Sequence, residues 1–189
     1  MKKNGSGDTW KSSCFNRVLR GLAFLSLFAL PSGAKSLEVG SDAPPFELLG
    51  SDGKVHKLSD YKGRKEIVLA WFPKAFTPGW TNELVALRDS AELLKNFDAE
   101  IFMVSLDDPQ KNKEFSEALG SAHVLLSDPE KEVAATYGVI GFGGLYARRW
   151  TYYIDREGVG RDIDKNVDTQ TAGQDIAARL ESLGFYKRN

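Results

Sequence analysis

The sequence predicts an α/β fold in which a central mixed β-sheet is flanked by helices. Two continuous apolar runs, at residues 66–72 and 101–106, are typical of central strands that are buried on both faces. Segments with helical spacing alternate with these strands along the chain, which is the order expected of helices that cover a sheet. A hairpin signal around residues 155–158 adds an antiparallel pair and makes the sheet mixed.

The first half of the folded chain is predicted to hold the first central strand and the first long helix. Residues 37–53 are rich in Gly, Pro, Ser and Asp and predict an extended lead-in that is broken by turns. Residues 54–58 predict a short strand. The run Glu66–Phe72 predicts a buried strand, which Pro73 ends. Thr81–Phe97 has its apolar residues on one face at helical spacing, so it predicts a single helix.

The second half continues the alternation and closes the fold. The predicted elements are, in order, a strand at 101–106, a helix at 109–119, a strand at 124–126, a helix at 129–137, hairpin strands at 149–154 and 159–163, and a helix at 171–183. This order is that of a thioredoxin-like domain, although the pattern alone does not separate it from other small α/β sheets.

Composition excludes several classes of function. The chain has 189 residues, of which 27% are charged and 42% hydrophobic, as expected of one globular domain rather than a disordered or polytopic membrane protein. The net charge of −1 gives no basic field for nucleic acid. Two histidines, which we expect to be structural or at the surface, and one cysteine argue against a zinc site and exclude an internal disulfide. We therefore expect no metal and no nucleic-acid partner.

The first 34 residues have the three regions of a secretory signal peptide. Five cations precede Leu22–Leu30, an apolar run of nine residues that is shorter than the about 20 needed to span a bilayer. Small residues follow at 32–34. The sequence thus predicts a signal peptide at 1–34, a domain at 35–189 and export to the periplasm or the extracellular space. An organelle transit peptide, which would lead to an organelle lumen, and an uncleaved anchor are the alternatives.

Cleavage after Ala34 would also remove the cysteine. Cys14 lies within the predicted signal peptide, so the mature chain would contain no thiol and no membrane span. It would work in an oxidising compartment without a disulfide.

The most informative segment is the turn between the first central strand and the first long helix. The strand ends at Pro73, the turn holds Thr77, and the helix is expected to begin near Trp80. Backbone N–H groups at a helix start are unpaired and the helix dipole is positive there. Such a place favours an anion, for example a thiolate or a bound oxyanion.

This segment resembles the peroxiredoxins, in particular the bacterioferritin-comigratory branch. That family carries a Pro, three residues, a Thr or Ser, two residues and then the peroxide-attacking Cys, and Pro73, Thr77 and position 80 fit this spacing. The resemblance extends through FPKAFTPG and to later landmarks at 105–107, 126–129 and 137–139. It identifies Arg149 as the family's active-site arginine and Glu83 as the acid that helps to orient it.

The resemblance implies a thioredoxin-like fold and thiol-dependent reduction of hydroperoxides without a cofactor. The departure from the family lies at position 80, where Trp80 stands in place of the peroxidatic Cys. Positions 84 and 85, the common places for a resolving Cys, hold Leu and Val, so an active protein would need an external reductant such as thioredoxin or glutathione.

Several alternatives remain open at this point. Trp80 is either a core aromatic residue over an inactive site or the printed form of selenocysteine, whose UGA codon a standard translation can read as Trp. In the first case the protein would be an inactive relative that binds a small anion or a protein partner. Arg149 beside Arg148 also fits a surface cation, Thr77 plain turn chemistry, and Glu83 an acid that caps the helix start.

Overall fold

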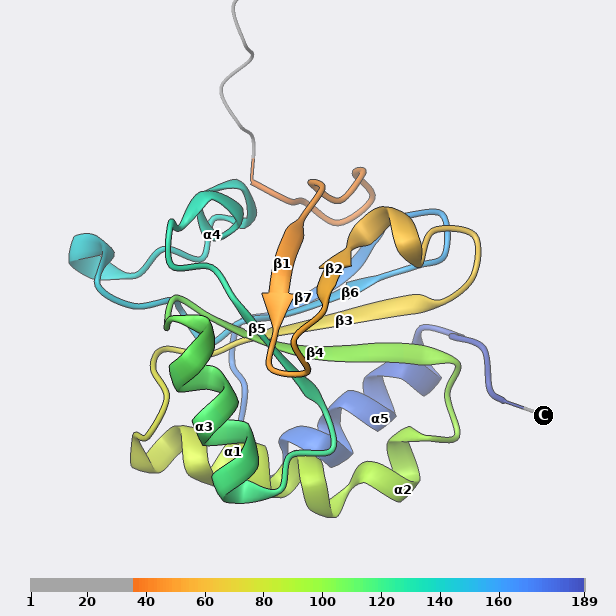
Figure 1. The fold of residues 1–189 in the computed structure, drawn as a ribbon. Coiled ribbons are helices and arrows are strands. Elements are labelled where there is room, and N and C mark those ends of the chain that lie inside the picture. The colour runs from red at the N-terminus through yellow and green to blue at the C-terminus, as the bar shows by residue number, and fades with distance from the viewer. Residues whose placement is uncertain (1–35, 189) are drawn as a thin grey trace, which may run out of the picture. The chain divides into compact units, whose positions relative to one another are not determined.

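A seven-stranded sheet organises residues 36–188, the part of the chain that this computed structural model describes (Figure 1). The strand order is β2-β1-β5-β4-β3-β6-β7. The strands are β1 (Glu47–Gly50), β2 (Val55–Lys57), β3 (Glu66–Trp71), β4 (Ala99–Ser105), β5 (Val124–Ser127), β6 (Thr151–Ile154) and β7 (Gly160–Asp164). The central strands β3, β4 and β5 are parallel and the outer pairings are antiparallel, so the predicted mixed sheet of a thioredoxin-like α/β fold is confirmed.

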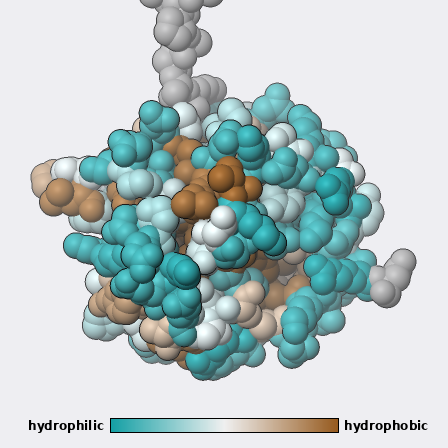
Figure 2. Space-filling view, viewed as in Figure 1, coloured by the Kyte–Doolittle hydropathy of each residue, from teal (hydrophilic) through white to brown (hydrophobic). Residues whose placement is uncertain are grey.

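Helices cover both faces of this sheet. The helices are α1 (Pro78–Asp89), α2 (Ala91–Leu94), α3 (Pro109–Leu119), α4 (Glu132–Tyr137) and α5 (Ala172–Ser182), with short 3-10 turns at η1 (Leu58–Asp60) and η2 (Phe142–Gly144). Helices α1, α2, α3 and α5 lie on one face and α4 on the other (Figure 1). On the side seen in Figure 2, most of the surface is hydrophilic and hydrophobic side chains form only small patches.

The apolar run of β3 is continuous because both of its faces are buried. Val68 and Ala70 pack in the cluster beneath α1 and α5, whereas Ile67, Leu69 and Trp71 pack in the cluster on the α4 side. Successive side chains of a strand point to opposite faces, so each face receives every second residue of the run.

The predicted helix Thr81–Phe97 is wrong in its extent, because the structure divides it. Helix α1 begins at Pro78, with proline in the first turn where its missing N–H costs nothing. It ends at Asp89, and α2 starts after Ser90, whose φ and ψ of −93° and 5° are not helical. Helix α5 packs tightly against this break, since a Cβ atom on Gly173 would come within 2.5 Å of the Ser90 side chain.

Two other boundaries differ from the sequence prediction. The lead-in at 37–53 contains a strand, β1, which joins the sheet by pairing with both β5 and β2. Helix α4 begins at Glu132 rather than Pro129, after Lys131 with a positive φ of 64°. The predicted signal peptide lies outside the described residues and stays a prediction. Among residues 36–188, no helix has both the length and the apolar character that crossing a membrane requires.

Candidate active site

The loop between β3 and α1 carries the first two predicted site residues. The Phe72 N–H donates to the Val104 carbonyl oxygen at 2.9 Å, so the strand pairing continues up to Pro73, which is half-buried. Thr77 takes the N-cap position of α1 with extended backbone angles. Its hydroxyl donates to the Lys74 carbonyl oxygen at 3.0 Å instead of capping the helix, so the turn role of Thr77 is present in the structure. The oxygen keeps lone pairs with which to accept a hydrogen bond.

The same loop holds a strained residue. Phe76 has a positive φ of 60°, in the left-handed region that costs a side-chain-bearing residue roughly 1–2 kcal/mol. Its ring is 54% exposed and makes an edge contact with Phe115, with the ring centroids 4.8 Å apart. The preceding Ala75 N–H donates to Asp107 Oδ2 at 2.8 Å. The sequence marked Asp107 only as a landmark, and no local pattern indicates that it reaches this loop.

Glu83, a residue of α1, forms a direct ion pair with Arg149, which lies just before β6. Arg149 Nη1 donates to Glu83 Oε2, the Glu83 side chain is 1% exposed, and that of Arg149 is 21% exposed. A Cβ atom on Gly79 would lie 3.4 Å from Arg149 Nη2, which places the guanidinium beside the first turn of α1. Burial lowers the pKa of Arg149. Arg149 therefore lies beside the first turn of α1 in an ion pair, in contrast to exposed Arg148, and Glu83 pairs with it rather than capping the helix start.

Trp80 lies fully buried under the first turn of α1. Its ring stacks face to face on Phe72, with centroids 3.4 Å and planes 5° apart, and contacts Phe115 at 5.6 Å. Aromatic pairs usually prefer offset or edge contacts at about 4.5–7 Å. The indole N–H has no hydrogen-bond partner within residues 36–188, which costs about 1–3 kcal/mol for a buried donor. The indole is tightly packed and its one polar group is unsatisfied.

The structure therefore gathers the predicted site residues at the start of α1. Pro73 and Thr77 bound the loop, Trp80 fills the space beneath the first turn, and the Glu83–Arg149 pair lies beside that turn. Helix-start N–H groups and a guanidinium together favour an anion at this position. Within the described residues, no group of three or more His, Cys, Asp or Glu side chains is arranged to hold a metal ion.

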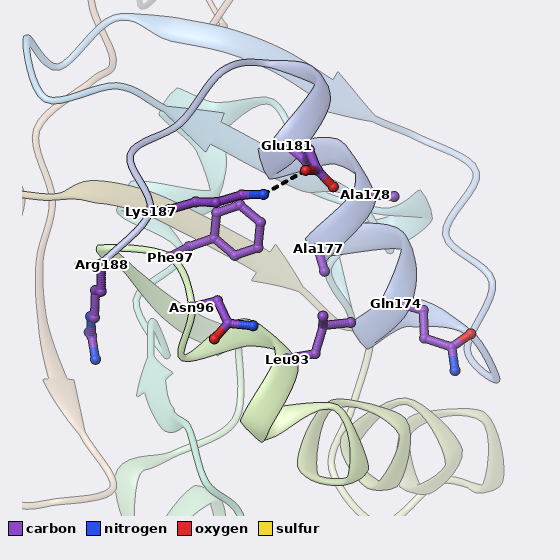
Figure 3. A pocket seen from close by; sticks show the side chains of 9 residues that line it. All are labelled: Leu93, Asn96, Phe97, Gln174, Ala177, Ala178, Glu181, Lys187 and Arg188. Atoms are coloured by element: carbon purple, nitrogen blue, oxygen red, sulfur yellow. Dashed lines mark hydrogen bonds and ion pairs between the residues drawn. The ribbon is translucent and has the colours of Figure 1, made fainter.

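A surface pocket of about 450 Å³ lies elsewhere, between α2, α5 and the C-terminal segment (Figure 3). Phe97 and Ala177 line it, and Lys187 and Glu181 form an ion pair of 2.6 Å at its edge. None of the five predicted site residues lines this pocket, so it does not belong to the candidate site.

Comparisons with known proteins find similar sequences and similar structures. Residues 39–163 match the AhpC/TSA family. The chain is 42% identical over 129 residues to peroxiredoxin Bcp of Bacillus subtilis, a match that covers 65% of this chain and 82% of that protein. It is 40% identical over 153 residues to the putative peroxiredoxin bcp of Haemophilus influenzae, with 78% and 98% covered.

A solved structure of the bacterioferritin comigratory protein of Xanthomonas campestris is also similar. It superposes with a TM-score of 0.68 at 25% sequence identity, over 77% of this chain and 96% of that one. The similarity in sequence and in fold therefore covers most of the chain, including the region of the candidate site.

Proposed function

Because the chain belongs to the AhpC/TSA peroxiredoxin family, we propose that it reduces hydroperoxides at position 80 and that this position is selenocysteine in the living protein. The observation that carries the proposal is the buried Glu83–Arg149 pair beside the first turn of α1. This pair holds the Arg149 guanidinium next to the place where an anionic nucleophile at position 80 would lie. The similar Xanthomonas protein is described as having alkyl peroxide reduction activity, which supports a hydroperoxide as the substrate class.

The packing of Trp80 also supports a smaller native residue. An indole can donate one hydrogen bond but has no thiolate-like lone pair with which to attack a peroxide. The close stack of Trp80 on Phe72 supports a smaller native residue at position 80, whereas the unpaired N–H is shared by buried Trp71 and does not separate the two candidates. A selenol would leave no buried N–H donor unpaired, and it would open the space that the indole fills to a peroxide.

The proposed reaction is a two-electron reduction of the peroxide. The selenolate attacks one peroxide oxygen, a Se–O bond forms as the O–O bond breaks, and the leaving alkoxide takes a proton to give an alcohol. Arg149 offsets the negative charge of the selenolate and Glu83 holds Arg149. The Thr77 hydroxyl gives its proton to the Lys74 carbonyl oxygen, so it would accept a hydrogen bond from the O–H of the peroxide. One external thiol then displaces water from the selenenic acid, and a second releases the selenolate and a disulfide. Thioredoxin or glutathione would supply these thiols, because positions 84 and 85 hold no cysteine.

An inactive binding protein is the second candidate, and the complete burial of Trp80 favours it. The ring is 0% exposed and belongs to the core cluster beneath α1, as a structural aromatic residue would. In this case the start of α1 and Arg149 would bind a small anion, or the fold would bind a protein partner.

The codon at position 80 decides between the two candidates. A TGA codon with selenium in the native protein supports the peroxidase, and a TGG codon contradicts it. A direct assay adds a second measurement. The purified chain with Trp80 is expected to consume no hydroperoxide above a blank with dithiothreitol, and clear turnover would contradict a mechanism that needs a chalcogen at position 80.

We also propose that residues 1–34 are a signal peptide and that the mature protein acts in the periplasm or outside the cell. The five cations, the short apolar run and the small residues at 32–34 support this proposal. Sequencing the N-terminus of the native protein tests it. A start at Lys35 supports cleavage, and a start at Met1 contradicts it. Recovery in an organelle lumen would instead support a transit peptide.

A further inference from the structure

We propose that Asp107 is a positioning residue for the candidate site, an inference that rests on the proposed peroxidase function. Asp107 follows β4 and lies 32 positions beyond Ala75, yet its Oδ2 accepts the Ala75 N–H at 2.8 Å. Parallel strands β3 and β4 end at the same edge of the sheet, where the loop to α1 and the start of α3 lie (Figure 1). This hydrogen bond ties the loop before α1 to the edge of the sheet.

Asp107 is itself held by a buried polar network. Its N–H donates to Ser105 Oγ at 3.1 Å, and this hydroxyl donates to Asn112 Oδ1 at 3.2 Å. Asn112 is fully buried in α3 and its Nδ2 donates to Ser127 Oγ, at the end of β5, at 2.8 Å. The backbone that carries the Asp107 carboxylate is therefore fixed relative to two strands and one helix.

A neighbouring lysine balances the charge of this carboxylate. Lys111 Nζ donates to Asp107 Oδ1, the oxygen that does not contact Ala75. The Asp107 side chain is only 8% exposed, and a charge so far from water needs such a partner. The ion pair lets Asp107 hold the Ala75 amide by a charge-assisted hydrogen bond, which is shorter and stronger than a neutral one.

The loop needs this support because of its backbone conformation. Phe76 follows Ala75 directly and has a positive φ, a state that persists only where its surroundings hold it. The Asp107 bond fixes the residue before it, and the bond from the Thr77 hydroxyl to Lys74 fixes the residue after it. Since α1 begins immediately after Thr77, the loop sets where position 80 lies relative to Arg149. A misplacement of about 1 Å at a reacting group can cost on the order of 100-fold in rate.

The test uses full-length protein carrying Trp80→Cys, into which Asp107→Ala or Asp107→Asn is introduced. Asp108→Ala is the matched control, because Asp108 caps α3 by accepting the Lys111 N–H at 2.9 Å and has no hydrogen bond to the loop. Three quantities are measured: hydrogen exchange at the Ala75 amide, kcat/KM for hydroperoxide, and the pH dependence of iodoacetamide alkylation at position 80, followed on that peptide by mass spectrometry.

We expect Asp107→Ala to speed exchange at Ala75 at least about 10-fold, to lower kcat/KM about 10- to 100-fold and to move the alkylation profile to higher pH. Asp107→Asn keeps an oxygen acceptor and should restore much of each property. Asp108→Ala should leave all three unchanged. If Asp107→Ala does not fold, Lys111→Met is compared with the parent instead, because it removes the charge that balances the Asp107 carboxylate. Unchanged exchange and alkylation in Lys111→Met would overturn the proposal.

The outcomes separate this inference from the proposed function. If the Trp80→Cys protein lacks peroxidase activity but Asp107→Ala still frees the Ala75 amide and shifts alkylation, the positioning role stands and the peroxidase function is wrong. If Asp107→Ala behaves like Asp108→Ala in exchange and alkylation, the positioning role is wrong whatever the activity.

Discussion

At the scale of single residues, the proposed peroxidase function depends on which residue stands at position 80. Every other predicted site residue lies around the start of α1, with Arg149 and Glu83 paired and Thr77 at the N-cap. The surroundings therefore suit an anion, whereas the residue they surround, Trp80, is neutral and has no nucleophilic atom.

The variant Trp80→Cys is expected to gain dithiothreitol-dependent peroxidase activity, because a thiol at the helix start beside a guanidinium has a lowered pKa. Consumption of hydroperoxide measures this gain against the Trp80 protein. Trp80→Ser is the matched control and should stay at the blank, since an unactivated hydroxyl is a weak nucleophile. A Trp80→Cys protein that folds and stays inert would show that Thr77 and Arg149 do not form a working site.

The Glu83–Arg149 pair also predicts a measurable loss of stability. Arg149→Met leaves the Glu83 carboxylate buried without its partner, which is expected to lower the free energy of unfolding by about 3–5 kcal/mol. Adding Glu83→Gln should recover part of this loss, because the unpaired charge is gone. Urea unfolding measures both.

Arg148→Met is the control for the arginine substitution. Arg148 is exposed and lies 5.1 Å from the Trp150 ring, a contact worth about 0.5–1 kcal/mol. Equal losses for Arg148→Met and Arg149→Met would contradict the buried pair.

At the scale of elements, the sequence predicts a helix or strand best where the local pattern alone determines it. Strands β3 and β4 were predictable because their apolar runs need no knowledge of their neighbours. The resemblance to the peroxiredoxin motif, rather than any local propensity, predicted that Pro73, Thr77 and Arg149 would lie near one another. The division between α1 and α2 was not predictable, because the apolar spacing continues through Ser90 and the tight packing of α5 there is a tertiary contact. Strand β1 and the reach of Asp107 to Ala75 likewise depend on tertiary contacts.

The contact between α1 and α5 reverses the usual effect of a glycine in a helix. Gly→Ala in an exposed helix usually stabilises by about 1 kcal/mol. At Gly173 a Cβ atom would lie 2.7 Å from the Ala86 carbonyl oxygen as well as 2.5 Å from Ser90, so Gly173→Ala should instead destabilise by about 1–3 kcal/mol. Thermal unfolding measures the sign.

Ser90→Gly combined with Gly173→Ala separates the two clashes at this contact. The double variant removes the side-chain clash but keeps the backbone one, so it should recover only part of the loss. A stabilised Gly173→Ala protein would show that the two helices do not pack this closely.

At the scale of the whole molecule, one half-buried histidine should link stability to pH. His123 lies just before β5, with its Nε2 unpaired within the described residues. Burial lowers the pKa of His123 below its ordinary value of 6.5, and this effect outweighs the opposing influences of the Glu100 charge and of a hydrogen bond to the Leu87 backbone. The folded protein therefore holds the neutral ring, and the unfolded chain binds the proton more readily.

The sign of the pH effect follows from this difference in proton binding. His123 contributes fully to stability above pH 6.5, the unfolded value, and the contribution falls as the pH decreases below 6.5 towards the lower folded pKa. The variant His123→Gln should therefore flatten the decrease in unfolding free energy between about pH 7.5 and 5.5, a range above most carboxylate pKa values. Urea unfolding at several pH values measures the slope.

His56→Gln, which replaces the second of the two histidines, is the matched control and should retain the part of the slope that belongs to His123. Equal slopes for the parent and the His123→Gln protein would mean that water reaches the ring in the folded state.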